Sequence, residues 1–161
     1  MQAHFKSAVI FVKAMDASRQ FYEDLLGQEV EMDFGPNVGY RCGLALWQVD
    51  HACQTIYQCA PEAAGPLGRD NLELYFEADD LDALWAQLAA ADTPVAHPIC
   101  EQPWAQRVGR VYDPDGHIVE VAEPMTATLR RLLDAGMTAA AVAERTSMPL
   151  AAVMQVAGGG A

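Results

Sequence analysis

One pattern of strand and helix occurs twice in this chain, and it constrains the fold more than any other feature. Residues 7–12 are β-branched and aromatic, which predicts a strand, and Asp16 can cap a helix that continues through residue 26. The same pattern returns 66 residues later, where residues 73–78 predict a strand and Asp79 or Asp80 can cap the next helix. Three further strands are predicted after each helix, so we expect two successive βαβββ modules.

Glycine and proline separate the other predicted strands of both modules. Residues 35–37 and then Gly43 interrupt the apolar segments of the first module. Residues 113–116, Asp-Pro-Asp-Gly, are a strong turn signal between the last two strands of the second module. These predicted strands span residues 28–34, 38–42 and 44–49 in the first module and 94–99, 107–112 and 117–122 in the second.

The composition also indicates where the modules begin and end. We place module one at about residues 5–59, a linker rich in alanine, glycine and proline at 60–71, and module two at about 72–124. Together they form one predicted domain over residues 1–124. Residues 125–161 are predicted to form a small C-terminal helical extension, with helices at 126–134, from Thr138 to about Arg145, and from Pro149 onward, Pro149 being the first helical residue.

The last two predicted helices of this extension have a sequence pattern similar to that of a helix-turn-helix. A DNA-reading helix presents basic and amide side chains, whereas residues 149–156 contain neither lysine nor arginine. We therefore expect the extension to be a packing, lid or dimerisation element, in which methionine and alanine side chains suit helix docking.

The charge of the chain argues against two classes of partner. The formal net charge is −12, which repels nucleic acids and anionic membrane surfaces. No apolar run approaches the roughly 18 residues of a spanning helix, and the N-terminal residues show no signal-peptide pattern. The cysteines form no CxxC pair and no zinc-type spacing with histidine, so we expect reduced thiols in a soluble, cytoplasmic protein. They are Cys42, Cys53, Cys59 and Cys100.

Three segments carry a resemblance to a known superfamily. Residues 11–16 leading into 21–27 look like its first βα unit, residues 76–82 like the start of its second module, and residues 113–120 like its last hairpin. In this order and spacing, they resemble the glyoxalase/bleomycin-resistance/dioxygenase (vicinal oxygen chelate) superfamily. Residues 101–107 resemble a subgroup without a firm activity that also carries extra C-terminal helices.

The resemblance implies an α+β fold in which two βαβββ modules form a cupped, mixed sheet. Two such modules enclose a small-molecule site, either within one chain or across a homodimer. Metal-dependent members place a ligand on the first and last strand of each module. Carried over to this chain, those positions are Ser7, Trp47, Glu73 and Glu120.

These four residues do not form a full ligand set for a transition metal. Glu120 and Glu73 can ligate, but the Ser7 hydroxyl is a poor ligand and the Trp47 indole is none. The resemblance leaves a divalent metal on Glu73 and Glu120 open, with waters completing an oxygen-rich site. Of the four histidines, His51, His97 and His117 are predicted at the surface or in turns.

Without a metal, the two glutamates still predict a functional site. Two close carboxylates repel, so one tends to hold a proton, which suits general acid/base catalysis or contact with a cationic or hydroxyl-bearing ligand. The alternative is an ion pair between either glutamate and an arginine. The arginines considered are Arg41, Arg107 and Arg110.

Strand alternation names the other residues of the cup. Val9 and Phe11 are predicted to share a face with Ser7, Tyr75 and Glu77 a face with Glu73, and Ile118 a face with Glu120. The aromatic residues among them give an apolar wall typical of small-organic sites, although they can instead fill the core. Before the last hairpin, Trp104, Gln106 and Arg107 can form a lip, in which Arg107 binds an anionic group or pairs with Glu120. The predicted ligand-contacting residues are Ser7, Phe11, Trp47, Tyr75, Trp104, Gln106 and Arg107.

Two functions follow from these residues. The first is binding of a small organic molecule in an aromatic-walled cup, without the full four-ligand metal site. The second is a metal-dependent lyase, isomerase or dioxygenase that uses Glu73 and Glu120. The sequence does not decide whether the protein is an enzyme, and no cofactor other than the divalent metal is indicated.

Overall fold

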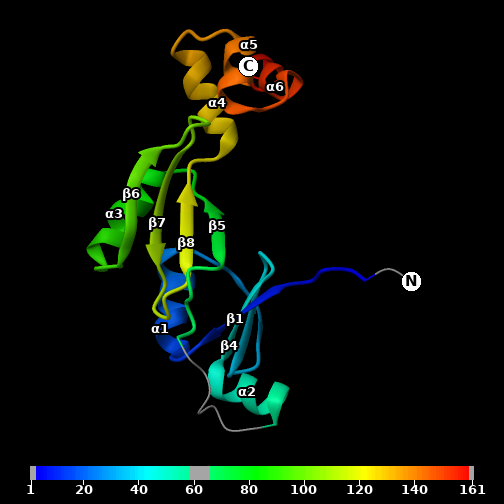
Figure 1. Ribbon diagram of the computed structural model, residues 1–161, viewed down its shortest axis with the longest axis vertical. Helices are drawn as coiled ribbons and strands as arrows, with labels where there is room; N and C mark the ends of the chain where they lie inside the picture. Colours follow the sequence, from blue (N-terminus) through cyan, green and yellow to red (C-terminus); the bar gives the residue numbers. More distant parts are fainter. Residues whose placement is uncertain (1–2, 59–65, 160–161) are drawn as a thin grey trace. The chain divides into compact units, whose positions relative to one another are not determined.

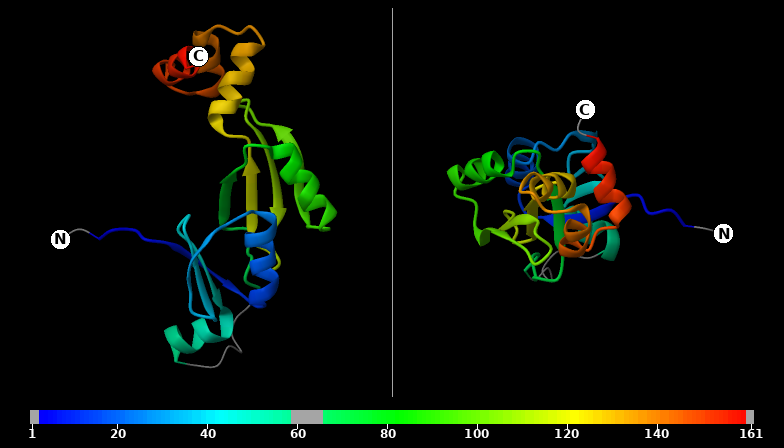
Figure 2. Two further views of the ribbon diagram at one scale, coloured as in Figure 1. Left: turned by 180° about the vertical axis from the view of Figure 1, so that it is seen from behind. Right: turned by 90° about the horizontal axis from the view of Figure 1, so that it is seen from above.

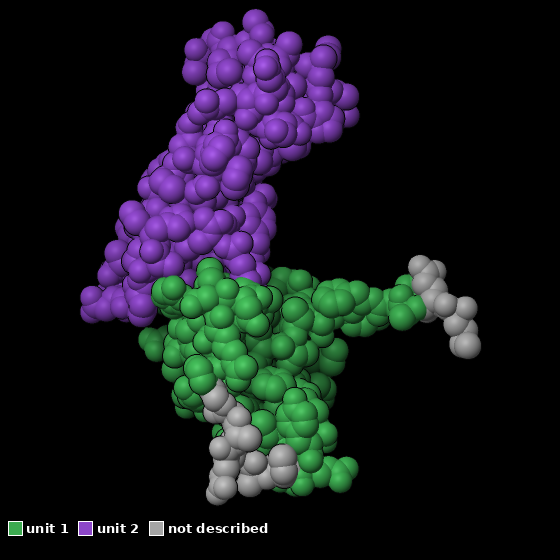
Figure 3. Space-filling model, viewed as in Figure 1, with its two compact units in different colours: residues 1–72, 112–118 green, residues 73–111, 119–161 purple. Residues whose placement is uncertain are grey.

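The computed structural model describes residues 3–58 and 66–159, and the chain forms two compact units (Figure 3). Unit 1 consists of residues 1–72 and 112–118, and unit 2 of residues 73–111 and 119–161. Each unit contains one four-stranded sheet with helices (Figure 1). The α+β class predicted from the repeated pattern is therefore confirmed.

The sheet of unit 1 follows the strand order β1-β4-β3-β2. β1 lies at its edge and pairs in parallel with β4, which places Phe11 beside Trp47, while the other pairs are antiparallel. Side chains alternate along β1, since Ile10 and Val12 are buried and Val9 is exposed. The strands span Ala8–Val12 (β1), Val30–Asp33 (β2), Asn37–Tyr40 (β3) and Leu44–Gln48 (β4).

The first predicted helix is present, with two differences. It begins as α1 (Met15–Arg19) and continues as a π-helical segment, η1 (Gln20–Leu25), which buries Phe21 and Tyr22. The predicted cap by Asp16 is wrong, because Ala14 occupies the cap position without a side-chain hydrogen bond and Asp16 lies in the first turn.

A helix that the sequence analysis did not predict, α2 (Val49–Tyr57), follows β4 directly. It buries Val49, Ala52 and Cys53 on one side. These positions share a helix face, so a helical period was present in the sequence. The predicted linker begins at residue 60, and residues 59–65 lie outside the described part of the chain.

Unit 2 repeats the architecture with the strand order β5-β8-β7-β6. Its helix α3 (Leu81–Ala90) begins after Asp80, whose side chain accepts a hydrogen bond from the Ala83 N–H, so the predicted cap is confirmed. Trp85 of α3 packs against the sheet at Gly109, where an added Cβ would lie 2.3 Å from the indole ring. The strands span Glu73–Glu77 (β5), Val95–Glu101 (β6), Arg107–Tyr112 (β7) and Ile118–Ala122 (β8).

Three helices follow β8 and pack on one another within unit 2 (Figure 2). Thr138 caps the second of them as predicted, by accepting a hydrogen bond from the Ala141 N–H. Pro149 lies one residue before the third helix rather than at its first position. They are α4 (Met125–Asp134), α5 (Ala139–Thr146) and α6 (Leu150–Gly158), and their core contains Leu129, Leu132, Val142, Val153 and the preceding Ala105. No helix in the described ranges is long and apolar enough to span a bilayer.

Candidate functional site

Three strands of unit 2 bring Glu73, Arg110 and Glu120 together. Arg110 of β7 donates from Nε to Glu73 Oε1 of β5 at 2.5 Å and from Nη2 to Glu120 Oε2 of β8. The Glu120 carboxylate is almost fully buried, whereas the side chain of Glu73 is 42% exposed. One guanidinium therefore lies between the two carboxylates that the sequence analysis singled out, and the ion-pair alternative is correct for Arg110.

His97 of β6 completes this cluster. Its Nε2 lies 2.7 Å from Arg110 Nη1, and since a guanidinium can only donate, Nε2 must be the acceptor. The other ring nitrogen, Nδ1, then carries the hydrogen and donates to the Pro98 carbonyl oxygen at 2.8 Å. His97 is half-buried and lies in a strand, so of its two predicted locations, the surface or a turn, the turn is wrong.

The electrostatic environment of Glu120 favours its neutral form. Burial raises the pKa of Glu120, and the neighbouring Glu73 carboxylate raises it further, whereas the Arg110 cation acts in the opposite direction. The pair therefore combines an exposed carboxylate with a buried one that accepts a proton more readily than a free glutamate.

A second group of polar and aromatic side chains lies in the same unit. Gln106 is buried and donates from Nε2 to Tyr75 Oη at 3.0 Å and to the Glu123 carbonyl at 2.8 Å. Its Oε1 accepts from Trp104 Nε1 at 2.9 Å, and the Tyr75 hydroxyl donates to Glu77 Oε1 at 2.8 Å. Tyr75 and Trp104 remain 50% and 36% exposed, so this network orients two aromatic side chains that are partly accessible to solvent.

Arg107 does not pair with Glu120. Its guanidinium forms two hydrogen bonds with the Asp82 carboxylate of α3, at 2.6 and 3.0 Å. Of the two alternatives for Arg107, pairing with Glu120 is therefore wrong, and binding of an anionic group stays a prediction. Odd and even residues of β7 point to opposite faces, which separates Arg107 from Arg110.

In unit 1, the predicted aromatic residues are in contact. Phe11 and Trp47 meet edge to face, with ring centroids 6.3 Å apart. Trp47 Nε1 donates to His51 Nδ1 at 2.7 Å, which orients the indole from the first turn of α2. His51 is exposed, as predicted, although it lies in a helix. Ser7, which precedes β1, is exposed as well.

Comparison with known proteins decides the family. Residues 5–126 match the family described as the glyoxalase-like domain. The chain belongs to the glyoxalase-like domain family.

Solved structures of the glyoxalase-like fold agree with this assignment. A protein of unknown function from Agrobacterium tumefaciens str. C58 is 36% identical, with a TM-score of 0.71 over 77% of this chain and 96% of that one. A lactoylglutathione lyase from Agrobacterium tumefaciens is 23% identical, with a TM-score of 0.58 over 78% and 96%. A glyoxalase/bleomycin resistance protein/dioxygenase from Nocardioides is 19% identical, with a TM-score of 0.58 over 76% and 84%. The curated proteins include no match.

The glyoxalase-like family implies a divalent metal, but the residues of this chain fit one poorly. Both candidate carboxylates, Glu73 and Glu120, already bind the Arg110 cation. In the described ranges, no group of three or more histidine, cysteine, aspartate or glutamate side chains has the geometry of a metal site. Ser7 and Trp47 belong to unit 1 and Glu73 and Glu120 to unit 2, and the convergence of the four positions stays a prediction.

The sequence analysis of this glyoxalase-like chain missed two features. It left His97 out of the site and placed His117 at the surface or in a turn. His117 directly follows the Asp113–Gly116 turn, but it is buried and its Nδ1 lies 2.8 Å from Asp113 Oδ2. The spacing of His117 from Asp113 within one hairpin is the sequence signal for this contact.

Proposed function

We propose that this glyoxalase-like protein binds a small organic molecule on the face of unit 2 that carries Glu73, Arg110 and Tyr75. The observation that supports this proposal is the position of Arg110, whose cation lies between Glu73 and Glu120. A guanidinium in this position neutralises the two carboxylates and holds their orientation. The site then recognises its ligand through hydrogen bonds and aromatic contact, with no step that requires a bound metal.

The exposed groups suggest the chemistry of the ligand. Tyr75 and Trp104 offer partly exposed rings whose polar atoms are already hydrogen-bonded to Gln106 or Glu77. The half-exposed Glu73 carboxylate retains acceptor capacity for a hydroxyl or amine group. An aromatic or amphipathic molecule with such a group is the ligand class that we propose. Within unit 1, Ser7, Phe11 and Trp47 are proposed as ligand-contacting residues, and within unit 2 Gln106 is proposed as the residue that positions both rings.

The proposal extends to the organisation of the protein. We propose that residues 1–124 form the ligand-binding domain and that residues 125–161 serve packing or dimerisation in a cytoplasmic homodimer. Light scattering coupled to size exclusion, on the full chain and on a chain ending at residue 124, measures the contribution of the helices to the dimer. A monomeric full chain would contradict the homodimer.

Ligand screening by thermal shift tests the proposed site. A panel of aromatic amines, phenols and amphipathic acids is screened against wild type, Tyr75→Ala and Trp104→Ala. A ligand that stabilises wild type is expected to lose about tenfold in affinity in each variant, because each removes one aromatic contact. Tyr57→Ala is the matched control, since Tyr57 is 64% exposed on α2 of the other unit. Equal affinity in all variants would place the ligand elsewhere.

Elemental mass spectrometry tests the absence of a metal requirement. The proposal expects no stoichiometric divalent metal in protein purified without a histidine tag, in wild type or Glu120→Ala. Near-stoichiometric metal that is lost in Glu120→Ala would overturn the proposal and favour a metal-dependent lyase, isomerase or dioxygenase that uses Glu73 and Glu120.

A further inference from the structure

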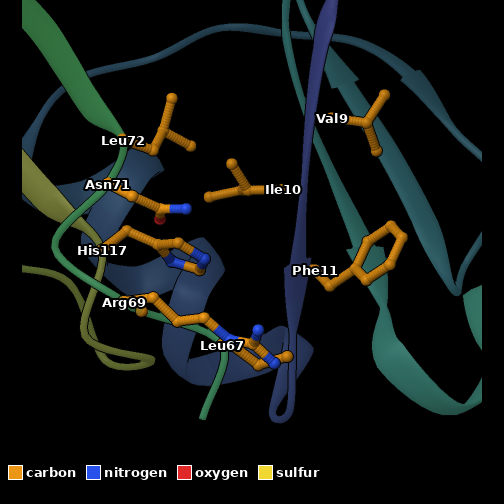
Figure 4. Close-up of a pocket in the computed structure, with 9 residues that line it drawn as sticks. Val9, Ile10, Phe11, Leu67, Arg69, Asn71, Leu72 and His117 are labelled. Atoms are coloured by element: carbon orange, nitrogen blue, oxygen red, sulfur yellow. The ribbon is translucent and has the colours of Figure 1, made fainter. Parts of the chain in front are cut away.

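A separate pocket of about 180 Å³ lies within unit 1, beside the edge strand β1. Figure 4 shows Ile10, Asn71 and His117 on one side of β1, while the side chains of Val9 and Phe11 point to the other side. The pocket is therefore on the opposite side of the strand from the Phe11–Trp47 contact. The apolar side chains at the pocket include Ile10, Leu67 and Leu72. The polar side chains are Arg69, Asn71 and His117.

A buried carboxylate determines how His117 faces this pocket. Asp113 Oδ2 accepts from Tyr22 Oη at 2.9 Å and lies 2.8 Å from His117 Nδ1, and Oδ1 accepts from the His117 backbone N–H at 2.8 Å. Although burial alone would raise the pKa of Asp113, these donors hold it below its usual value, so the group is a carboxylate and Nδ1 carries the hydrogen. In the described part of the chain, Nε2 of His117 has no hydrogen-bond partner. It is the ring nitrogen left for a ligand in the pocket.

The loop that carries Arg69 and Asn71 is attached to the same hairpin through glycine. Gly68 donates its N–H to the Asp115 carbonyl at 3.2 Å, and a Cβ on Gly68 would lie 1.8 Å from the Gly116 oxygen. Only a residue without a side chain allows this approach of the two backbones. The contact holds Arg69 and Asn71 beside His117.

The polar groups around the pocket are mainly hydrogen-bond donors. Arg69 uses Nε for the Pro66 carbonyl at 3.0 Å, and its terminal nitrogens have no ion-pair partner among the described residues. Asn71 adds an amide donor, and among the described residues no aspartate or glutamate side chain lines the pocket. In a chain with a net charge of −12, a pocket with a fixed cation and no acid favours an anion.

We infer that this pocket binds a small aliphatic monocarboxylate. The carboxylate would accept hydrogen bonds from Arg69 and Asn71, and the short alkyl chain would lie against Ile10, Leu67 and Leu72. His117 Nε2 lies where it contacts the ligand and reports its presence. A volume of 180 Å³ equals about six water molecules at roughly 30 Å³ each, which suits an acid of about four carbons. This binding site is independent of the function proposed for unit 2.

Nuclear magnetic resonance of the His117 imidazole tests the inference with sodium butyrate as the probe. The full chain is titrated at pH 7 and constant ionic strength, and the Cε1–H signal of His117 is followed. We expect a saturable shift in wild type. Arg69→Gln should raise the apparent Kd about tenfold, because a charge-assisted hydrogen bond is lost. Arg41→Gln is the control, since the Arg41 side chain is 71% exposed and pairs only with Glu29 in the described chain.

Three results would overturn the inference. The first is a His117 signal that does not respond saturably to butyrate, and the second is an equal Kd in wild type and Arg69→Gln. The third is a shift with butanol, the uncharged probe, that equals the shift with butyrate, because it would exclude carboxylate recognition. Arg69 is exposed and its loss leaves the Asp113–His117 contact intact, so the test does not depend on a variant that removes a buried hydrogen bond.

Discussion

Asp113 in unit 1 and Glu120 in unit 2 are buried carboxylates with opposite electrostatic environments. Asp113 of unit 1 is 3% exposed and accepts hydrogen bonds from Tyr22, His117 and the Asp115 N–H. Glu120 of unit 2 is 5% exposed and shares one guanidinium with Glu73. Burial raises the pKa of each group, but the donors around Asp113 reverse this effect, whereas Arg110 does not reverse it at Glu120.

The difference shows that burial alone does not assign a carboxylate to structure or to function. Asp113 has both oxygens occupied by protein donors, so it holds the last hairpin and the adjacent helix in place and has little capacity left for a ligand. The Glu120 carboxylate pairs with the Arg110 cation, and the half-exposed Glu73 carboxylate pairs with the same cation. A pair of this kind can exchange a proton or a hydrogen bond with a ligand without breaking the fold.

The largest effect is expected for Asp113→Ala. The change leaves buried donors of Tyr22, Asp115 and His117 without an acceptor, so the free energy of unfolding should fall by about 4 kcal/mol. Urea denaturation followed by circular dichroism measures this loss. Asp134→Ala is the control, because Asp134 is exposed at the end of α4 and should change stability by no more than about 0.5 kcal/mol. A loss below 1 kcal/mol for Asp113→Ala would contradict the structural role assigned to the Asp113 carboxylate.

The next largest effect on stability is expected for Arg110→Met. It keeps the aliphatic stem but leaves Glu120 buried without its cation, which should lower the free energy of unfolding at pH 8 by about 2 kcal/mol. The loss should be smaller at pH 5, because Glu120, whose pKa is raised by burial, then takes up a proton more readily. Urea denaturation at the two pH values measures both effects. A loss that is equal at pH 5 and pH 8 would mean that Arg110 acts through packing and not through charge.

The pH dependence of stability should have opposite signs for the two carboxylates. A lowered folded-state pKa at Asp113 gives stability that is present above its unfolded value, about 3.9, and is lost as the pH falls through the folded pKa. A raised folded-state pKa at Glu120 gives stability that is present below its unfolded value, about 4.3, and is lost as the pH rises through the folded pKa.

The Glu120→Gln variant tests the second prediction, that stability is lost as the pH rises through the folded-state pKa of Glu120. Relative to wild type, this variant should gain unfolding free energy between pH 4 and pH 7, because it no longer contains the group that loses stability as the pH rises. Thermal unfolding across this range is the measurement, and Glu144→Gln on α5 is the control for a surface glutamate. A variant that loses stability relative to wild type over the same range would reverse the assigned direction.

The smallest effect is expected for Glu73→Gln. Because Glu73 is half-exposed, the change should alter the free energy of unfolding by no more than about 0.5 kcal/mol. It removes a negative charge beside Glu120, so the pKa of Glu120 should fall, and carbon-detected NMR of the Glu120 carboxyl measures this directly. An unchanged Glu120 pKa would show that the two carboxylates do not interact.

The sequence predicted the fold well because its signals are local and repeated. The strand periods, the Asp80 and Thr138 caps and the Asp-Pro-Asp-Gly turn each depend on residues close together in the chain. The misses have physical reasons. Neither the π-helical segment η1 nor the cap at Ala14 follows from residue type, and α2 is short and follows a strand without a break.

The site was predicted less completely, because its contacts join distant residues. Glu73 and Glu120 were identified through the resemblance to the superfamily, which places ligands on the first and last strand of a module. The choice among Arg41, Arg107 and Arg110 requires the register of β7 against its neighbours. His97 depends on irregular pairing between β6 and β7, which shifts the register between His97 and Cys100. Neither feature can be read from spacing along the chain.

The contact of Trp85 with Gly109 limits the order in which this protein can change over evolution. A side chain at position 109 would overlap the indole, so a substitution there is disfavoured while the tryptophan remains. A smaller residue at position 85 leaves a cavity, which lowers the stability of the protein but causes no steric overlap. A lineage that replaces this pair is therefore expected to lose the tryptophan first and to fill the space from the strand afterwards, and ancestral intermediates built in the two orders should differ in whether they fold.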